Sequence, residues 1–180
     1  MQEYILIKQN VKILRKFTER RKVDRSWSSV EESLPPFLRA VLLADGTVTS
    51  LISAFMGEEI DVLAVEQGFI KMPDELSFLK LEKDTTAFVR KVNLIGRNTN
   101  KQYASAESLL NPALIGTDLF RALTDDGVGM GEVLRNNAQG SYREIINIQD
   151  TSTKIAERTY AVYLDRCPCI LITEAFNIDN

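Results

Sequence analysis

Helix-like patterns come early in this chain, and alternating, strand-like patterns fill its second half. Residues 3–22, 37–44 and 49–56 read as helices, and the turn signal Asp45-Gly46 separates the last two. Strand character is found at 59–66, 68–71, 87–95, 102–109, 141–149, 158–164 and 170–176, and further helical segments lie at 113–126 and before Ala138. Late hairpins after early helices predict an antiparallel α+β fold rather than a repeated βαβ unit.

Two charged residues lie in predicted strands at positions that should be apolar. Side chains alternate across a strand, so Glu174 lies on the apolar face of 170–176 and Arg90 on the apolar face of 87–95. A buried charge without a partner is costly. Each residue is therefore expected either to pair, with the other or with a structural partner, or to meet a ligand. The pattern leaves both alternatives open.

Composition narrows the classes of function. The chain has 180 residues, a size typical of one domain, and a net charge of −3, which argues against nucleic acid as the main partner. The basic stretch 12–25 is interrupted by acidic and apolar residues and is read as a solvated helix face. Because the sequence contains no histidine, histidine-based nucleophile systems and histidine-liganded metals are excluded.

The absence of membrane and signal segments and the spacing of the two cysteines indicate where the protein is located and that its thiols are reduced. No segment is long and apolar enough for a membrane span, and the N-terminus lacks a secretory signal pattern. Cys167 and Cys169 flank Pro168, too close for a relaxed disulfide, so reduced thiols and a cytoplasmic location are expected. The glycine-rich 127–131 follows a helical pattern rather than a strand, which disfavours a dinucleotide-binding loop.

Several short segments together resemble one enzyme family, the chorismate lyases (chorismate pyruvate-lyases), including their shorter archaeal and cyanobacterial relatives. The similarity extends from about Leu34 to Ile178 and rests on the order and spacing of these segments. They are LPPFLRAVLLADGTVT (34–49), FVRKV (88–92), VGMGEVL (128–134), RTY (158–160) and ITEAF (172–176).

The resemblance implies a fold and a reaction. The fold is an antiparallel sheet of about six strands with helices on one side, formed by 34–178, with 1–33 as an N-terminal helical extension of a single domain 1–180. The reaction removes pyruvate from chorismate and leaves 4-hydroxybenzoate, without metal or organic cofactor. Chorismate, 4-hydroxybenzoate and pyruvate are then the expected partners; the hydroxybenzoate isomer, the pathway served (quinone or secondary metabolite) and the oligomeric state stay open.

The family's motifs assign roles to two residues. Arg90 matches the substrate-binding arginine, which would bind a carboxylate and stabilise charge on the departing enolpyruvate. Glu174 matches the active-site glutamate, as general base for the ring proton or as acceptor for the ring hydroxyl. Apolar neighbours would raise its pKa and an arginine would lower it, and the sequence does not decide between them.

Further substrate-binding candidates are less specific. Met130 matches a ligand-packing loop position, although a gap-filling core methionine is an equal alternative. Tyr103 and Ser105 share a strand face and could donate hydrogen bonds, or lie on an ordinary half-exposed strand. The family's second arginine is missing, since Lys101-Gln102 stands there; Arg143 and Arg158 are the candidate replacements, and Arg143 could equally lie at the surface.

A binding module is the competing class. The same fold serves as the effector domain of bacterial transcription regulators, which bind small molecules, such as aromatic carboxylates, without converting them. Such regulators carry an N-terminal winged helix, and the roughly 33 residues before Leu34 are too few for one. The presence of both Arg90 and Glu174 favours the enzyme, because a binder of neutral ligands has little use for two buried charges.

Overall fold

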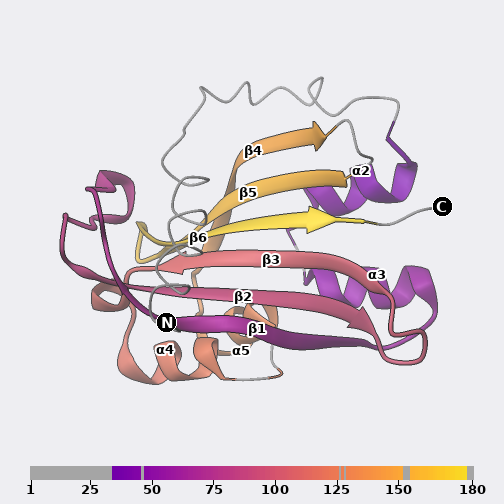
Figure 1. The fold of residues 1–180 in the computed structure, drawn as a ribbon, viewed down its shortest axis with the longest axis horizontal. Helices are drawn as coiled ribbons and strands as arrows, with labels where there is room; N and C mark the ends of the chain where they lie inside the picture. Colours follow the sequence, from indigo (N-terminus) through magenta and orange to yellow (C-terminus); the bar gives the residue numbers. More distant parts are fainter. Residues whose placement is uncertain (1–33, 46, 126, 128, 152–154, 178–180) are drawn as a thin grey trace, which may run out of the picture.

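The computed structural model describes residues 34–45, 47–125, 127, 129–151 and 155–177. They form one sheet in the order β1-β2-β3-β6-β5-β4, in which every neighbouring pair is antiparallel (Figure 1). The strands are β1 (Ile60–Lys71), β2 (Thr86–Gly96), β3 (Gln102–Leu110), β4 (Tyr142–Thr151), β5 (Ile155–Leu164) and β6 (Cys167–Phe176). The predicted antiparallel α+β class is confirmed.

The helices are short and begin and end at residues suited to those positions. They are α2 (Pro36–Leu43), α3 (Val48–Met56), α4 (Thr117–Thr124) and α5 (Met130–Asn137), with 3-10 turns η2 (Ser77–Leu79) and η3 (Pro112–Leu114). Pro36 opens α2, where its missing N–H costs nothing. Gly57 ends α3 in the left-handed region, with φ of 71°, which glycine adopts without strain.

The four α-helices of the described residues pack on one face of the sheet, as the family resemblance implies. α2 and α3 bury Leu42 and Ile52 against Leu94 and Phe176, while α4 and α5 bury Leu123 with a second group of strand residues. Figure 1 shows α2 and α3 towards one end of the sheet and α4 and α5 towards the other. The two helical pairs therefore cover different ends of the same face of the sheet.

On the opposite face of the sheet, a loop rather than a pair of α-helices covers one end. The loop between β1 and β2 carries η2 and packs Met72, Leu79 and Leu81 against Leu109 and Leu171 of the sheet. Both faces at this end are thus buried, which holds the central strands β3 and β6 between two apolar layers.

Several boundaries differ from the predicted ones: β5 and β6 each begin three residues earlier, and two further elements are divided differently. The predicted helix 113–126 is divided into η3 and α4, because Gly116, in extended conformation with ψ of 147°, caps α4 and interrupts the helix. The two predicted strand pieces 59–66 and 68–71 are one strand, β1, which has a bulge between Ala64 and Glu66. The predicted helix 3–22, and with it the proposed extension 1–33, lies outside the described residues.

The predicted final hairpin is confirmed, and its turn is tight. Asp165 and Arg166 join β5 to β6 with φ of 48° and 63°, the two positive values that a two-residue turn of type I′ requires. β6 then pairs with β3 on its other side and brings Glu174 opposite Ala106. The last strand of the chain thereby lies in the centre of the sheet.

A carboxylate holds the turn between β2 and β3. Glu58 Oε2 accepts hydrogen bonds from the amides of Asn98 (2.9 Å) and Thr99 (3.1 Å). Its Oε1 accepts from the hydroxyls of Tyr103 (2.5 Å) and Thr99 (2.7 Å). The Tyr103 hydrogen bond, followed by that from Thr99, lowers the pKa of Glu58 to about 2.

This lowered pKa predicts a pH-dependent stability. The folded pKa lies below the ordinary value of 4.5, so the carboxylate stabilises the fold above pH 4.5, and the contribution disappears as the pH falls towards about 2. We expect Glu58→Gln to lower the unfolding temperature at pH 7 and to have little effect at pH 2. Thermal unfolding at both pH values measures this, with the exposed Glu82→Gln as control; equal destabilisation at both would contradict it.

Candidate functional site

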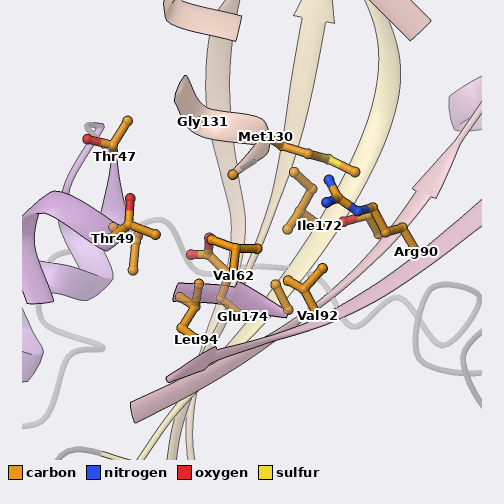
Figure 2. A pocket seen from close by; sticks show the side chains of 14 residues that line it. Thr47, Thr49, Val62, Arg90, Val92, Leu94, Met130, Gly131, Ile172 and Glu174 are labelled. Carbon is orange, nitrogen blue, oxygen red and sulfur yellow. The ribbon is translucent and has the colours of Figure 1, made fainter. Parts of the chain in front are cut away.

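A pocket lies on the helical face of the sheet, between the first residues of α3 and those of α5 (Figure 2). It encloses about 550 Å³ not occupied by protein atoms, part of it open to solvent. Its walls are formed by Thr47–Thr49 and Gly129–Gly131. Strands β1, β2, β3 and β6 supply the floor, which consists of Val62, Arg90, Val92, Leu94, Ala106, Ser108, Ile172 and Glu174. The pocket is thus mostly apolar, and it contains both charges that the sequence singled out.

Arg90 lines this pocket, and Figure 2 shows its guanidinium near the end of the Met130 side chain, on the side of the view opposite Thr47 and Thr49. Its side chain is among the largest fully buried ones of the described chain. Nη1 donates to the carbonyl of Leu123 (2.8 Å) and Nη2 to that of Asp125 (2.9 Å), both at the C-terminal end of α4. Helix C-terminal carbonyls attract cations, so α4 fixes the guanidinium in place without neutralising its charge.

Glu174 has a different partner from Arg90 and pairs with a structural residue rather than with Arg90 itself. Its Oε2 accepts a hydrogen bond from Arg158 Nε at 2.7 Å, and both side chains are buried, with exposed fractions of 9% and 2%. Its Oε1 accepts a hydrogen bond from the Tyr160 hydroxyl at 3.1 Å. Glu174 therefore forms a buried ion pair with Arg158 on the neighbouring strand β5, in register with it.

Tyr160 supports this carboxylate as a neutral donor. The hydroxyl is buried, and burial, together with the negative charge of Glu174, raises the pKa of Tyr160 above its ordinary value. The proton consequently stays on the phenol and is shared with Glu174.

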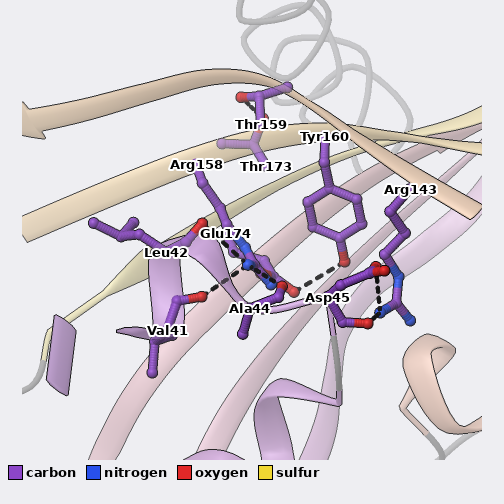
Figure 3. A network of polar contacts seen from close by, with 10 residues as sticks. All are labelled: Val41, Leu42, Ala44, Asp45, Arg143, Arg158, Thr159, Tyr160, Thr173 and Glu174. Carbon is purple, nitrogen blue, oxygen red and sulfur yellow. Dashed lines mark hydrogen bonds and ion pairs between the residues drawn. The ribbon is translucent and has the colours of Figure 1, made fainter. Parts of the chain in front are cut away.

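Arg158 lies behind Glu174 and outside the set of described residues that line the pocket. Besides Glu174, its partners are the carbonyls of Val41 (2.8 Å), Leu42 (3.2 Å) and Ala44 (2.7 Å), at the end of α2 (Figure 3). Its guanidinium also lies 5.1 Å from the centre of the Tyr160 ring. The structure thus places this predicted substrate-binding residue among protein groups.

Arg143 lies beside a neighbouring, more polar cavity with about 600 Å³ of empty space, lined also by Arg135, Ser141 and Tyr142. The two cavities share Thr47 and Gly131 as lining residues. Nη1 of Arg143 donates to the Asp45 carbonyl at 2.8 Å, and the side chain is 15% exposed (Figure 3). This predicted second cation is therefore next to the pocket, on its Gly131 side, rather than at the far surface.

Gly131 allows the close approach of these groups. A Cβ at this position would lie 3.2 Å from Nη2 of Arg143 and 3.4 Å from a methyl carbon of Thr47. Met130 precedes it and lines the pocket at the start of α5. The glycine-flanked loop thus brings Arg143, Thr47 and the pocket wall together.

Tyr103 and Ser105 lie outside the pocket-lining set of the described chain. The Tyr103 hydroxyl is bound to Glu58, and Ser105 lies on the face opposite Ala106. β3 presents Ala106 and Ser108 to the pocket instead. Sequence reasoning missed Ser108, although it is the residue that pairs with Arg90 across β2 and β3. This pairing depends on the register shift between Leu94 and Ile95, which the sequence pattern does not show.

The described part of the chain contains no group of three or more His, Cys, Asp or Glu residues that could hold a metal ion. None of its helices is long and apolar enough to cross a membrane. Cys167 and Cys169 are both free thiols, and burial raises the pKa of Cys169 to about 12, so this thiol stays protonated.

The fold resembles solved structures at low sequence identity. The crystal structure of PhnF from Mycobacterium smegmatis matches with a TM-score of 0.56 and 10% identity over 75% of this chain, which spans 65% of that protein. The effector domain of PhnF matches with a TM-score of 0.54 and 12% identity, over 75% of this chain and 90% of the domain. These likenesses show a shared fold only.

The sequence comparison identifies a family. No curated protein sequence matches the chain significantly. The sequence profile described as "Chorismate pyruvate-lyase Rv2949c-like" matches residues 42–180, which include Arg90 and Glu174, while the narrower likeness to archaeal and cyanobacterial members stays a prediction. By this match over most of its length, the chain belongs to the Rv2949c-like chorismate pyruvate-lyase family.

Proposed function

We propose that this protein eliminates pyruvate from chorismate and releases 4-hydroxybenzoate. The observation that carries the proposal is one mostly apolar pocket into which a buried arginine and a buried glutamate are built, Arg90 from β2 and Glu174 from β6. Membership of the chorismate pyruvate-lyase family supports the same reaction. Fixed charges in a pocket lined mostly by apolar groups act more strongly on a substrate than they do in bulk solvent.

The pocket is suited to an anionic substrate. Chorismate has two carboxylates, one on the ring and one on the enolpyruvyl ether. Arg90 supplies one cation, and the first turns of α3 and α5, whose amides lack intrahelical partners, border the same space. Arg143, next to Gly131, is our candidate for the second carboxylate in place of the missing family arginine.

Arg90 stabilises the charge that develops as the bond breaks. Two of its N–H groups are bound to carbonyls of α4, which orients the guanidinium before substrate arrives. The planar fork of a guanidinium suits the geometry of a carboxylate. A cation held in this way needs no reorganisation in the transition state.

Glu174 acts at the ring. The carbon–oxygen bond to the enolpyruvyl group breaks, and a proton leaves the ring carbon that carries the hydroxyl, so the ring becomes aromatic; the enolpyruvate takes up a proton to become pyruvate. Glu174 already accepts hydrogen bonds from Arg158 and Tyr160, and a carboxylate has about four acceptor positions. A free acceptor position can take the ring proton or hold the hydroxyl.

A binding module is the second candidate. The observation in its favour is that the fold of this chain is shared with a domain described as an effector domain. Such a module would hold an aromatic carboxylate in the same pocket without converting it.

We expect the substitution Gly131→Ala to weaken the binding of chorismate selectively. The new methyl group would crowd Arg143 and Thr47, whereas the Cβ of Gly129→Ala would make ordinary contacts, the nearest at 3.8 Å with Val62. We expect Gly131→Ala to raise KM for chorismate about tenfold, the cost of displacing one charged contact, and Gly129→Ala to change it little. Steady-state kinetics of both variants measures this; equal effects would contradict the role given to Arg143.

The experiment that tests the function is product analysis. Purified protein is incubated with chorismate, and pyruvate and the hydroxybenzoate isomers are separated by chromatography beside an active control enzyme. Formation of 4-hydroxybenzoate above the spontaneous background supports the proposal. Formation of another hydroxybenzoate isomer would mean that the elimination has a different regiochemistry. Tight binding of 4-hydroxybenzoate with no turnover would leave the binding module.

A further inference from the structure

Arg158 joins two parts of the pocket that are far apart in the chain. One is Glu174 on β6, and the other is the segment that ends α2 and leads to Thr47 in the pocket wall. Figure 3 shows the guanidinium between the carboxylate and the carbonyls of Val41 and Ala44. With 2% of its side chain exposed, Arg158 is enclosed on all sides.

Each part is bound by a different edge of the same rigid group. Nε donates to Glu174 Oε2 at 2.7 Å, and Nη1 donates to the carbonyls of Val41 at 2.8 Å and Ala44 at 2.7 Å. The guanidinium is planar, so these donor directions are fixed relative to each other. A shift of the α2 carbonyls must therefore move the donor to Glu174, and a shift of Glu174 must move the end of α2.

We infer that Arg158 is a positioning residue, which orients Glu174 in the pocket and couples it to the wall at the start of α3. It holds Oε2, while Tyr160 holds Oε1 from the same strand, and together they set the plane of the carboxylate. Ala44 and Asp45 then connect the clamped end of α2 to Thr47. This role rests on the proposed elimination, in which Glu174 acts on the ring, and it differs from direct contact with the substrate.

Arg158→Lys is the informative variant, because lysine keeps one positive charge near Glu174 but cannot donate from two fixed edges. The matched control is Thr159→Val, which removes the 2.8 Å side-chain hydrogen bond between Thr159 and Thr173 on the same two strands, facing away from the pocket. Both variants are assayed for kcat and KM on chorismate at a temperature at which each is fully folded. Amide hydrogen exchange of residues 44, 45 and 47–49 is measured in Glu174→Gln and in wild type.

Misplacement of a reacting group by about 1 Å costs on the order of 100-fold in rate. We expect Arg158→Lys to lower kcat by about this factor, with Thr159→Val close to wild type, and Glu174→Gln to speed exchange in the α2–α3 segment. If the wild type is active but Arg158→Lys and Thr159→Val lose kcat equally, the positioning role is overturned and the lyase function stands. If wild type shows no turnover, the lyase falls, and the coupling is then judged by exchange alone: unchanged exchange in Glu174→Gln overturns it.

Discussion

Arg90→Met is expected to lower kcat/KM for chorismate by about 1,000-fold, because removal of one preorganised charge donor costs on the order of 100- to 1,000-fold. The substitution also removes a carboxylate contact, which adds to the loss. The side chain points into the pocket and is held by the carbonyls of Leu123 and Asp125. Initial rates of 4-hydroxybenzoate formation measure the effect.

Lys91→Met provides the control for this change. Lys91 is the next residue of β2, lies on the opposite face and forms an ion pair with Glu107 at 3.0 Å. We expect kcat/KM of Lys91→Met to stay within about threefold of the wild-type value, because ion pairs near the surface contribute little energy. Activity of Arg90→Met within tenfold of wild type would remove Arg90 from the proposed chemistry.

Arg158→Met is expected to cause the largest loss of stability. Removal of one partner of a buried ion pair leaves the other charge uncompensated, which costs about 3–5 kcal/mol. Here Glu174 would remain buried, and the carbonyls of Val41, Leu42 and Ala44 would lose their donor. Equilibrium unfolding in urea measures the free energy of unfolding.

The double variant Arg158→Met/Glu174→Leu separates the two causes. It removes both charges, so we expect it to regain at least half of the stability lost in Arg158→Met. A single variant that loses less than about 1 kcal/mol, or a double variant that is no more stable than the single one, would show that the buried charge is not the dominant cost.

Strand parity correctly predicted the face on which Arg90 and Glu174 lie. Each interrupts an apolar face, and the structure shows that helices cover this face and that both residues line the pocket there. Parity could not predict their partners. Arg158 lies opposite Glu174 because the β5–β6 hairpin shifts its register between Val162 and Tyr163, a detail that a local pattern does not encode.

Strand parity did not identify the residues of β3 that line the pocket, and a shift in register contributes to this failure. The register between β2 and β3 shifts where Leu94 pairs with Ala104 and Ile95 with Gln102, which leaves Tyr103 as the extra residue. Tyr103 then turns towards Glu58, while Ser105 keeps the face away from the pocket. A bulge in a hairpin with polar residues on both faces leaves no clear signature in the sequence.

The walls of the pocket were the least predictable part. Thr47 and Gly131 meet through α2–α3 and α4–α5, segments that are distant in sequence and are joined only by packing on the sheet. The position of Arg143 beside Gly131 depends on the same packing, so its sequence pattern alone was equally consistent with a surface position.

The most direct test of the account is the stoichiometry of a single turnover. Protein in excess over chorismate is quenched at intervals, and pyruvate and 4-hydroxybenzoate are quantified beside Glu174→Gln. The account predicts equal amounts of both products, formed far faster than the spontaneous reaction by the wild type and close to the spontaneous rate by the variant. If chorismate disappears only at the spontaneous rate while the protein is folded, the account is contradicted.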